Sequence, residues 1–322
     1  MFLVIGNTTL DLLNSGIPQM PTMRGDEFTV DSLVFCPEPL QMLLGGNGSI
    51  TAYALARLGA SVTLGSAIGQ DPSGALLTQW LQGAGVDMRA LMRHPTAATP
   101  TTTLVSDVAR NRLAFHHAGA SRYYTPTDLP SELLLQTEVL LVSAFTLFPQ
   151  WRPHGFAQLL ANAKAAGAIT ALDIGPAIGQ PVTLAEIAFL LPHVDYFIGN
   201  EHEIAVCCGV DKSASGSAAG MAQLLAAGAG YVVIKRGAEG ALIQTKGDEQ
   251  SIYVPAFAVN AHTTVGAGDS FNAGFLYALH QGHTPLAAAR FANAVAALVV
   301  TSAQGALGAP TLAQVEQLCN TF

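Results

Sequence analysis

The chain has 322 residues, a length that fits one large domain with a smaller appendage. Half of the residues are hydrophobic, 11% are charged and 32 are glycine, which is typical of a compact α/β protein and excludes a disordered or fibrous one. The formal net charge of −8 excludes a general nucleic-acid binder, because the chain offers no basic stripe to neutralise a phosphate backbone.

Short apolar runs alternate with longer segments of helical periodicity along the chain. In chain order we expect a strand at 2–6, a helix at 49–59, a strand at 61–69, a helix at 74–85, a strand at 139–145, a helix at 155–167, strands at 168–175 and 194–200, a helix at 218–228 and a strand at 231–237. Each helical segment ends at a glycine, as a left-handed C-cap requires. This alternation predicts an α/β fold with a doubly wound, mostly parallel sheet.

Two segments interrupt the alternation. Residues 12–42 are rich in Pro, Thr and Met, and residues 97–122 have the pattern of a β-hairpin. We expect these segments to form a small β-sheet lid over a core made of residues 1–11, 43–96 and 123–322. His116 and His117 lie in the second segment, and we expect them to alternate across a strand, one inward and one outward, rather than to bind a metal.

No segment has the pattern of a membrane span or a targeting signal. The most apolar stretch, residues 285–310, is interrupted by Arg290, Asn293, Ser302 and Gln304, which indicates a buried helix and its exit. The N-terminus has no basic region and carries Asp11 early. The four cysteines lack metal-ligand spacing and are expected to be buried, reduced thiols. These features predict a cytoplasmic protein without a membrane partner.

The segment TTVGAGDSFNAGF, residues 263–275, places three small residues and an acid before an apolar helix. Backbone amides at a helix N-terminus are unpaired, the helix dipole adds positive potential, and glycines let an anion approach closely. The loop therefore suits an anion site. Two interpretations of Asp269 stay open on these residues: it caps the helix, or it faces the group that attacks a bound phosphate.

Five motifs follow one another along the chain. They are GGNGSITAYALARLG (45–59), its extension SAIGQDPSGALLTQWLQGAGVD (66–87), Asn-x-x-Glu (200–203), Gly-x-x-Gly (237–240) and TTVGAGD (263–269). Together they resemble the signatures of the ribokinase-like (phosphofructokinase B) carbohydrate kinase family, in the order of that family and over essentially the whole chain. The resemblance implies transfer of the γ-phosphate of ATP to a sugar-type hydroxyl.

The resemblance assigns the catalytic roles to the glycine-rich loop. Asp269 is expected to accept the hydroxyl proton, and the amides of Gly266, Ala267 and Gly268 are expected to stabilise the transferring phosphoryl group. We take Asp269 to be an ordinary carboxyl group, with a pKa of about 3.9, and so ionised at neutral pH.

The nucleotide and the metal are expected to bind at the ends of two later strands. The resemblance gives Asn200 and Glu203 the organisation of Mg²⁺, often through water, although Asn200 also suits a helix cap. Lys235, Gly237 and Gly240 are expected to border ATP. Asn293 matches a position near the adenine, and a helix-packing role is an equal alternative for it.

The acceptor is expected to bind near the end of the first strand. Asp11 matches an acid that binds sugar hydroxyls, with a solvated turn residue as the alternative. Gly45 and Gly46 match a pair whose amides approach the sugar, and Asn47 is a further candidate contact.

Two positions depart from the family pattern. Ile50 stands where relatives have Asn, which puts ribose in doubt and raises an acceptor with an apolar or aromatic part, such as a nucleoside. Thr263 stands where relatives have an Asp that helps to hold a monovalent cation, so we expect weak or absent K⁺ dependence.

We therefore predict ATP-dependent phosphorylation of a primary hydroxyl on a small sugar, polyol or nucleoside, with Mg²⁺ as cofactor. The lid is expected to exclude water and to pair between subunits in a homodimer. The alternative is a non-catalytic sugar- or nucleoside-binding module derived from a kinase. ADP as the phosphate donor is disfavoured by the match to ATP-using relatives.

Overall fold

The computed structural model describes residues 1–22, 30–109, 111–143, 145–177 and 179–321. Within these residues the strands form a large sheet of nine and a small sheet of four. The large sheet has the order β13-β12-β11-β10-β9-β8-β1-β4-β5. Its strands are β1 Phe2–Ile5, β4 Val62–Gly69, β5 Leu91–His94, β8 Val139–Val142, β9 Ile169–Asp173, β10 Tyr196–Asn200, β11 Tyr231–Lys235, β12 Ala241–Thr245 and β13 Ile252–Val254.

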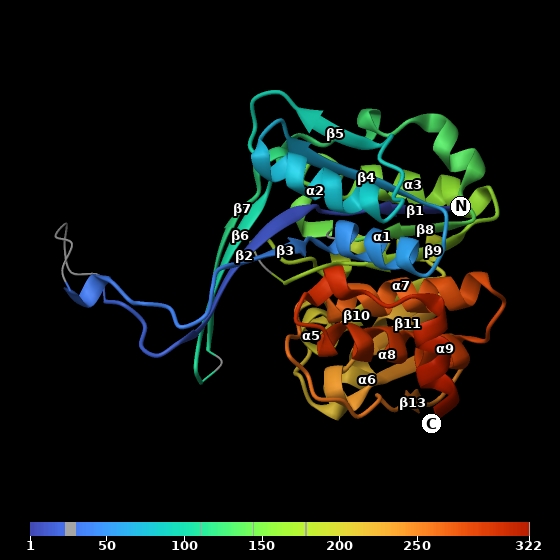
Figure 1. Cartoon of the computed structure of the whole chain (residues 1–322). Helices are drawn as coiled ribbons and strands as arrows, with labels where there is room; N and C mark the ends of the chain where they lie inside the picture. Colours follow the sequence, from blue (N-terminus) through green and yellow to red (C-terminus); the bar gives the residue numbers. More distant parts are fainter. Residues whose placement is uncertain (23–29, 110, 144, 178, 322) are drawn as a thin grey trace.

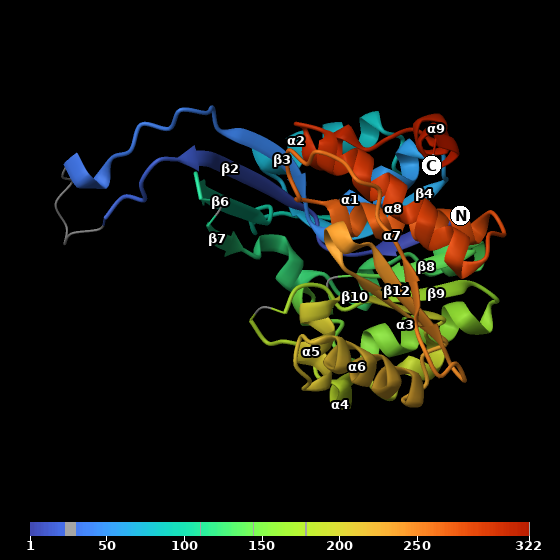
Figure 2. The same cartoon turned by 90° about the horizontal axis from the view of Figure 1, so that it is seen from below.

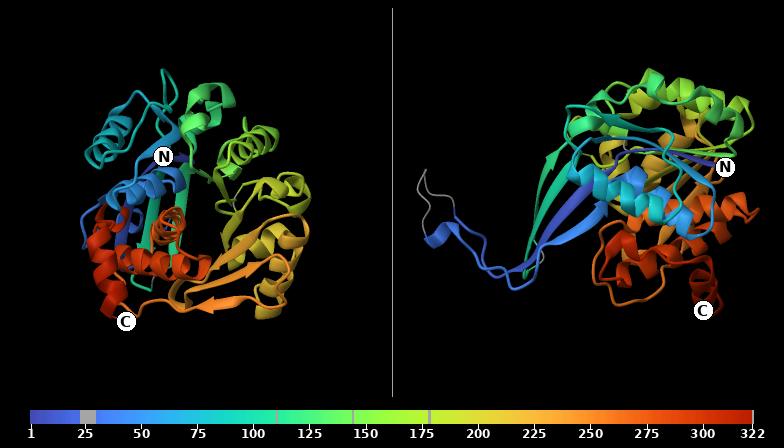
Figure 3. Two further views of the ribbon diagram at one scale, coloured as in Figure 1. Left: turned by 90° about the vertical axis from the view of Figure 1, so that its right-hand side faces the viewer. Right: turned by 45° about the horizontal axis from the view of Figure 1, so that its top comes forward.

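Helices cover both faces of the large sheet (Figure 3). Alternate side chains of β1 point to opposite faces of the sheet. Phe2 and Val4 pack in a core that also contains Phe271 and Phe275. Leu3 and Ile5 pack in a second core, which contains Phe156. The helices are α1 Asn47–Arg57, α2 Pro72–Gly83, α3 His154–Ala165, α4 Leu184–Ile187, α5 Glu201–Cys208, α6 Ala214–Ala226, α7 Ala267–His280, α8 Pro285–Thr301 and α9 Leu312–Thr321. The predicted doubly wound α/β fold is confirmed.

All six predicted strands and all four predicted helices are present within a few residues of the expected bounds. The glycines that follow those helices have the positive φ of a left-handed cap: Gly59 at 89°, Gly85 at 87°, Gly167 at 88° and Gly228 at 123°. The antiparallel strands β12 and β13 at one edge of the sheet were not predicted.

The small sheet stands at one end of the molecule and projects away from it (Figures 1 and 2). It has the order β3-β2-β6-β7, and its strands are β2 Thr9–Ile17, β3 Gln41–Gly45, β6 Thr101–Asp107 and β7 Arg112–His117. Asp11, Thr102 and His116 are cross-strand partners and share one face, so the lid strands bring polar side chains beside the core. The division into core and lid at the predicted residues stays a prediction, and part of segment 12–42, residues 23–29, lies outside the described residues.

His116 and His117 alternate across β7, as predicted: His116 shares the face of Asp11 and Thr102, and His117 lies on the opposite face. Both residues are nevertheless exposed, because β7 is the edge strand of the small sheet. The expectation of buried cysteines is wrong for Cys36, which is exposed, whereas Cys207 is buried and all four thiols are free.

The apolar stretch at 285–310 forms α8 and a short helical turn after it, as predicted. Among the residues that the structure describes, no helix combines the length and the apolar character that a membrane span needs.

Candidate active site

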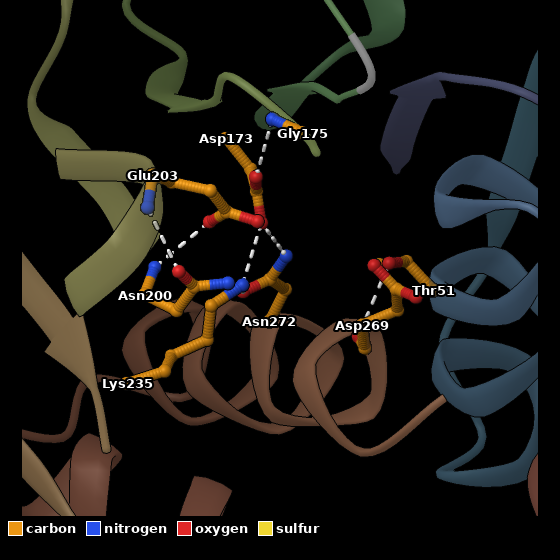
Figure 4. A network of polar contacts seen from close by, with 8 residues as sticks. All are labelled: Thr51, Asp173, Gly175, Asn200, Glu203, Lys235, Asp269 and Asn272. Atoms are coloured by element: carbon orange, nitrogen blue, oxygen red, sulfur yellow. Dashed lines mark hydrogen bonds and ion pairs between the residues drawn. The ribbon is translucent and has the colours of Figure 1, made fainter. Parts of the chain in front are cut away.

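Three neighbouring parallel strands end in polar residues at the same edge of the large sheet. Asp173 ends β9, Asn200 ends β10 and Lys235 ends β11, and the strand register places Asn200 opposite Lys235. The amino end of α7, which carries Asp269 and Asn272, faces them (Figure 4). This edge is where open α/β sheets bind ligands.

The loop before α7 has the geometry of an anion site. Gly266 is the N-cap of α7 and has a φ of 80°, in the left-handed region that favours glycine. Among the described residues, no carbonyl accepts from the amide of Gly266 or Gly268, and the amide of Ala267 makes only a long contact of 3.4 Å to the carbonyl of Thr264. The unpaired amides and the helix dipole together favour a negative charge at this point.

Asp269 does not behave as an ordinary aspartate. Desolvation raises its pKa to about 7, and the negative charges of Asp173 and Asp11 add to the rise, whereas the ammonium of Lys235 and a hydrogen bond from Asn47 oppose it. The expectation that this carboxyl is fully ionised at neutral pH is therefore wrong. A base with a pKa near the working pH is well matched to proton transfer.

The backbone of Asp269 is held by a hydrogen bond from α1. The hydroxyl of Thr51 on α1 donates to the main-chain carbonyl of Asp269 at 3.1 Å (Figure 4). The N-cap position belongs to Gly266, and no side-chain cap is made there. A helix cap is thus not the role of Asp269.

A buried network surrounds Asp173 (Figure 4). Lys235 Nζ donates to Asp173 Oδ2 at 2.7 Å and to Asn272 Oδ1 at 3.3 Å, and Asn272 Nδ2 donates to the same Asp173 oxygen at 2.6 Å. The amide of Gly175 donates to Asp173 Oδ1 at 2.9 Å. The buried polar atoms of Asp173, Lys235 and Asn272 are thus hydrogen-bonded to one another, as is usual for buried polar groups.

Asn200 and Glu203 form a reciprocal cap of α5. The Glu203 amide donates to Asn200 Oδ1 at 2.9 Å and the Asn200 amide donates to Glu203 Oε2 at 2.8 Å. Desolvation, together with the charge of the nearby Asp173 carboxylate, raises the pKa of Glu203 to about 7. The cap is present, and the excess of negative charge beside it would also favour a cation.

Asp11 lies on the small sheet, facing the site. Desolvation raises its pKa to about 6, while a hydrogen bond from Thr102 opposes the rise. Its Oδ1 atom is buried and has no partner among the described residues. A methyl group placed on Gly45 would lie 2.3 Å from the Asp11 carboxyl atoms, so the glycine is needed for this packing. Asp11 is thus a buried acid and not a solvated turn residue.

Gly46 and Asn47 link α1 to the site. Gly46 has a φ of 90°, and a methyl group there would lie 2.4 Å from the carbonyl oxygen of Asn7. The same carbonyl accepts from the first amides of α1, those of Gly48 and Ser49. A hydrogen bond from the Asn47 side chain lowers the pKa of Asp269, so this side chain favours the ionised carboxylate.

The residues expected around the nucleotide lie after β11 and on α8. Gly237 has a φ of 58°, and a methyl group on Gly240 would lie 2.1 Å from the carbonyl oxygen of Val254. Asn293 Nδ2 donates to the carbonyls of Pro255 at 3.0 Å and Val254 at 3.2 Å. The packing role of Asn293 is therefore present, and a contact with adenine stays a prediction.

Ile50 and Thr263 have local structural roles. Ile50 is 3% exposed and packs beneath the anion loop, where a methyl group on Gly266 would lie 3.4 Å from its Cδ1 atom. The Thr263 hydroxyl accepts from the amide of Val265 at 3.2 Å. Ile50 therefore belongs to the core under the loop.

Sequence reasoning missed Asp173, Asn272, Thr102 and Arg112. An acid that ends a buried parallel strand was a usable signal for Asp173, and the spacing of three residues from Asp269 was one for Asn272. Thr102 is the cross-strand neighbour of Asp11, and its hydroxyl lies 3.2 Å from His116 Nδ1. Arg112 donates from both terminal nitrogens to the Thr264 hydroxyl at 3.2 Å, across a cavity of about 410 Å³ between the small sheet and residues 261–265.

The sequence profile described as "pfkB family carbohydrate kinase" matches residues 27–312. The chain belongs to this family. It is a phosphotransferase with an alcohol group as acceptor, which confirms the predicted class of enzyme.

Two curated relatives illustrate the range of this kinase family. A nucleoside kinase of Methanothermobacter thermautotrophicus is 26% identical over 92% of this chain and 88% of its own length. A deoxyribokinase of Salmonella typhimurium is 26% identical over 92% of each chain.

Among solved structures, the ribokinase of Arabidopsis thaliana in complex with ribose and ATP has a TM-score of 0.84 and is 23% identical over 98% of this kinase and 97% of its own chain. The nucleoside kinase of Methanocaldococcus jannaschii has a TM-score of 0.79 and is 20% identical over 100% of this kinase and 98% of its own chain. These likenesses show the shared fold.

Proposed function

We propose that this kinase transfers the γ-phosphate of ATP to a primary hydroxyl of a small sugar, polyol or nucleoside. The observation that carries the proposal is the position of Asp269. It directly follows Gly268, the amides of Gly266 and Gly268 have no carbonyl partner among the described residues, and the pKa of Asp269 is raised to about 7. A base and an anion site thus meet at one helix terminus.

The proton and the phosphoryl charge have separate acceptors in this scheme. Asp269 takes the proton of the attacking hydroxyl as the oxygen–phosphorus bond forms and the bond to the ADP oxygen breaks. The amides of Gly266, Ala267 and Gly268 stabilise the charge on the transferring group. Phosphoryl transfer depends mainly on positioning and electrostatics, so such equipment is adequate.

The residues around Glu203 fit a magnesium ion. Three carboxyl groups, those of Asp173, Glu203 and Asp269, act on one another electrostatically and share one buried cation, Lys235. Desolvation is the main cause of the raised pKa of Glu203, and repulsion by the carboxylates of Asp173 and Asp269 adds to it, so a divalent cation beside these groups would stabilise their ionised forms. Asn200 and Glu203 would hold Mg²⁺ through water, and the bound ion would neutralise phosphate charge.

Asp11 is the best candidate for binding an acceptor hydroxyl. Its unpaired, buried Oδ1 atom can accept such a hydroxyl, and Gly45 leaves it the room to do so. The relatives include kinases named for nucleosides and for deoxyribose, and both carry a primary hydroxyl. ATP consumption measured with a panel of sugars, polyols, sugar acids and nucleosides would identify the acceptor.

The variant Asp269→Asn tests the function. We expect kcat to fall by about 10²- to 10⁴-fold, the usual contribution of a general base, while ATP still binds. Asp195→Asn is the matched control, because Asp195 pairs with Lys164 at 2.8 Å outside the site, and it should retain activity.

A non-catalytic binding module is the alternative, and it predicts no turnover in the wild-type protein for either variant to lose. Ile50 no longer favours this alternative, because its side chain packs under the anion loop. Thr263 remains the basis for expecting weak K⁺ dependence, and several-fold activation by K⁺ over a non-coordinating cation at equal ionic strength would contradict it.

A further inference from the structure

Lys235 lies beside the anion loop, and Thr51, which anchors the backbone of Asp269, lies on the other side of Asp269 (Figure 4). A methyl group placed on Gly268 would lie 3.5 Å from Lys235 Nζ, so the ammonium lies beside the loop whose amides are unpaired, with room for only one further carbon between them. The side chain of Lys235 is 12% exposed. A buried ammonium at this point adds a full positive charge to the partial charge of the helix terminus.

Asp173 fixes where that ammonium lies. It is the carboxylate in direct contact with Lys235, and its own side chain is 2% exposed. Asn272 accepts from Lys235 and donates to Asp173, so the three side chains form a closed triangle. A flexible lysine is confined to one position only when its partners are themselves fixed, and Asp173 is fixed by the amide of Gly175.

The position of Asp173 also separates it from the reacting atoms. Its Oδ1 atom is occupied by the Gly175 amide, and its Oδ2 atom accepts from both Lys235 and Asn272. Its side chain is 2% exposed and both oxygens already accept hydrogen bonds, whereas Asp11 Oδ1 accepts none. Asp173 can therefore act on the reaction only through Lys235 and through its charge.

We propose that Asp173 is a positioning residue for phosphoryl transfer: with Asn272 it holds the Lys235 ammonium beside the amino end of α7, where that charge meets the transferring phosphoryl group. The inference rests on the proposed function and adds to it the residue that places the cation. No bond to Asp173 forms or breaks. Its negative charge keeps Lys235 protonated in a buried place, and Lys235 gives the electrostatic assistance.

The experiment compares Asp173→Asn, Lys235→Met and the double variant with wild type. Each single substitution should lower kcat by roughly tenfold or more, and the KM of the acceptor should change by less than about twofold, because the lost interaction is made to the phosphoryl group. In the double variant kcat should equal that of Lys235→Met, since Asp173 acts through a lysine that is no longer present.

The pH profile of kcat/KM gives a readout that a purely structural role would not move. The groups that act on Asp269 are Lys235, Asp173, Asp11, Glu203 and Asn47. Because Lys235 opposes the rise in the pKa of Asp269 more strongly than Asp173 adds to it, loss of the ammonium from its place should shift the acid limb to higher pH in both Lys235→Met and Asp173→Asn. A shift of both limbs to higher pH supports the proposal, and a shift to lower pH or no shift in Asp173→Asn overturns it.

Asp195→Asn serves again as the matched control, because Asp195 also combines an ion pair with lysine and hydrogen bonds to a neighbouring threonine. Loss of kcat in this control equal to that in Asp173→Asn would show a general effect of breaking such pairs, and would overturn the inference. If Asp173→Asn does not fold, the comparison of the double variant with Lys235→Met decides: a further loss of kcat beyond about threefold contradicts the proposal.

The two levels of the proposal fail differently. If the wild-type protein phosphorylates no acceptor in the panel, both the proposed function and this inference are wrong. An active wild type with an equally active Asp173→Asn variant removes this inference alone.

Discussion

Three carboxyl groups of the site are buried where the ionised form is disfavoured, those of Asp269, Asp11 and Glu203. Desolvation raises the pKa of Asp11 to about 6 and that of Glu203 and Asp269 to about 7. Such pKa shifts are common at functional sites, because catalytic acids and bases need pKa values near the working pH. For Asp269 the consequence is direct, since only the ionised form can accept a proton.

The pH dependence of activity follows from this shift. The carboxyl of Asp269 is protonated below its pKa of about 7, so kcat/KM should fall about tenfold per pH unit at lower pH and level off above it. A pH series at fixed ionic strength measures the limb. A profile that stays flat down to pH 5 would contradict the role of Asp269 as the base.

Gly45→Ala tests the acceptor side at the scale of one methyl group. The added carbon would lie 2.3 Å from the Asp11 carboxyl and must displace it. We expect the KM of the acceptor to rise by roughly tenfold or more, with the KM of ATP unchanged, because the displaced hydrogen bond serves only the acceptor. Gly83→Ala is the control, since nothing lies within 4 Å of its added carbon. An equal change in the acceptor KM in both variants would show that Asp11 does not bind the acceptor.

At the scale of elements, the site is assembled from helix and strand termini. The amino end of α7 supplies the anion loop, the amino end of α5 supplies Asn200 and Glu203, and the strand ends supply Asp173 and Lys235. The cap of α5 and the left-handed Gly266 are local features, and the motifs predicted their positions from the sequence. The partnership of Asp173 with Lys235 joins residues 62 apart in sequence, so no local pattern could predict it.

The small sheet is joined to the anion loop by Arg112 on β7. Its two hydrogen bonds to Thr264 reach the residue two before Gly266. Arg112→Ala should loosen this contact, which would raise the KM of the acceptor several-fold and increase ATP hydrolysis without acceptor, because water then enters the site. Coupled assays of ADP and of phosphorylated acceptor give the ratio of ADP formed to product formed, which should exceed one in Arg112→Ala.

The control for Arg112→Ala is Arg89→Ala, which removes an exposed arginine paired with Asp87 outside the small sheet. An unchanged ratio of ADP to product in Arg112→Ala would show that this contact has no part in closing the site.

At the scale of the whole molecule, the outer face of the small sheet is apolar and exposed. Met42, Leu113 and Phe115 lie on the face opposite Asp11 and are 52%, 50% and 64% exposed. A second copy of the chain, packed face to face, would bury these side chains, and this supports the predicted homodimer through the lid.

The dimer is tested by light scattering at micromolar concentration. The wild type should have the mass of two chains, and Phe115→Glu should have the mass of one, because a charge cannot be buried at the centre of the interface without a partner. Leu135→Glu is the control, since Leu135 is 86% exposed and lies outside the small sheet. A monomeric wild type would contradict the prediction.

Local sequence patterns were enough to predict the succession of strands and helices, the glycines that end the helices, and the loop that begins α7. These features depend on interactions within a few residues, so period, caps and glycine positions are sufficient to predict them. The short antiparallel strands β12 and β13 were missed, because runs of three to five residues carry little periodicity.

The electrostatics of the site arise from the folded arrangement of the chain and could not be predicted from local sequence. The pKa of Asp269 depends on charges from β2, β9 and β11 and on a hydrogen bond from α1, which are distant in sequence. Likewise Ile50 became a core residue beneath Gly266 only when α1 met the loop before α7. Desolvation and Coulomb interactions act through space, so they exist only after the chain has brought these groups together.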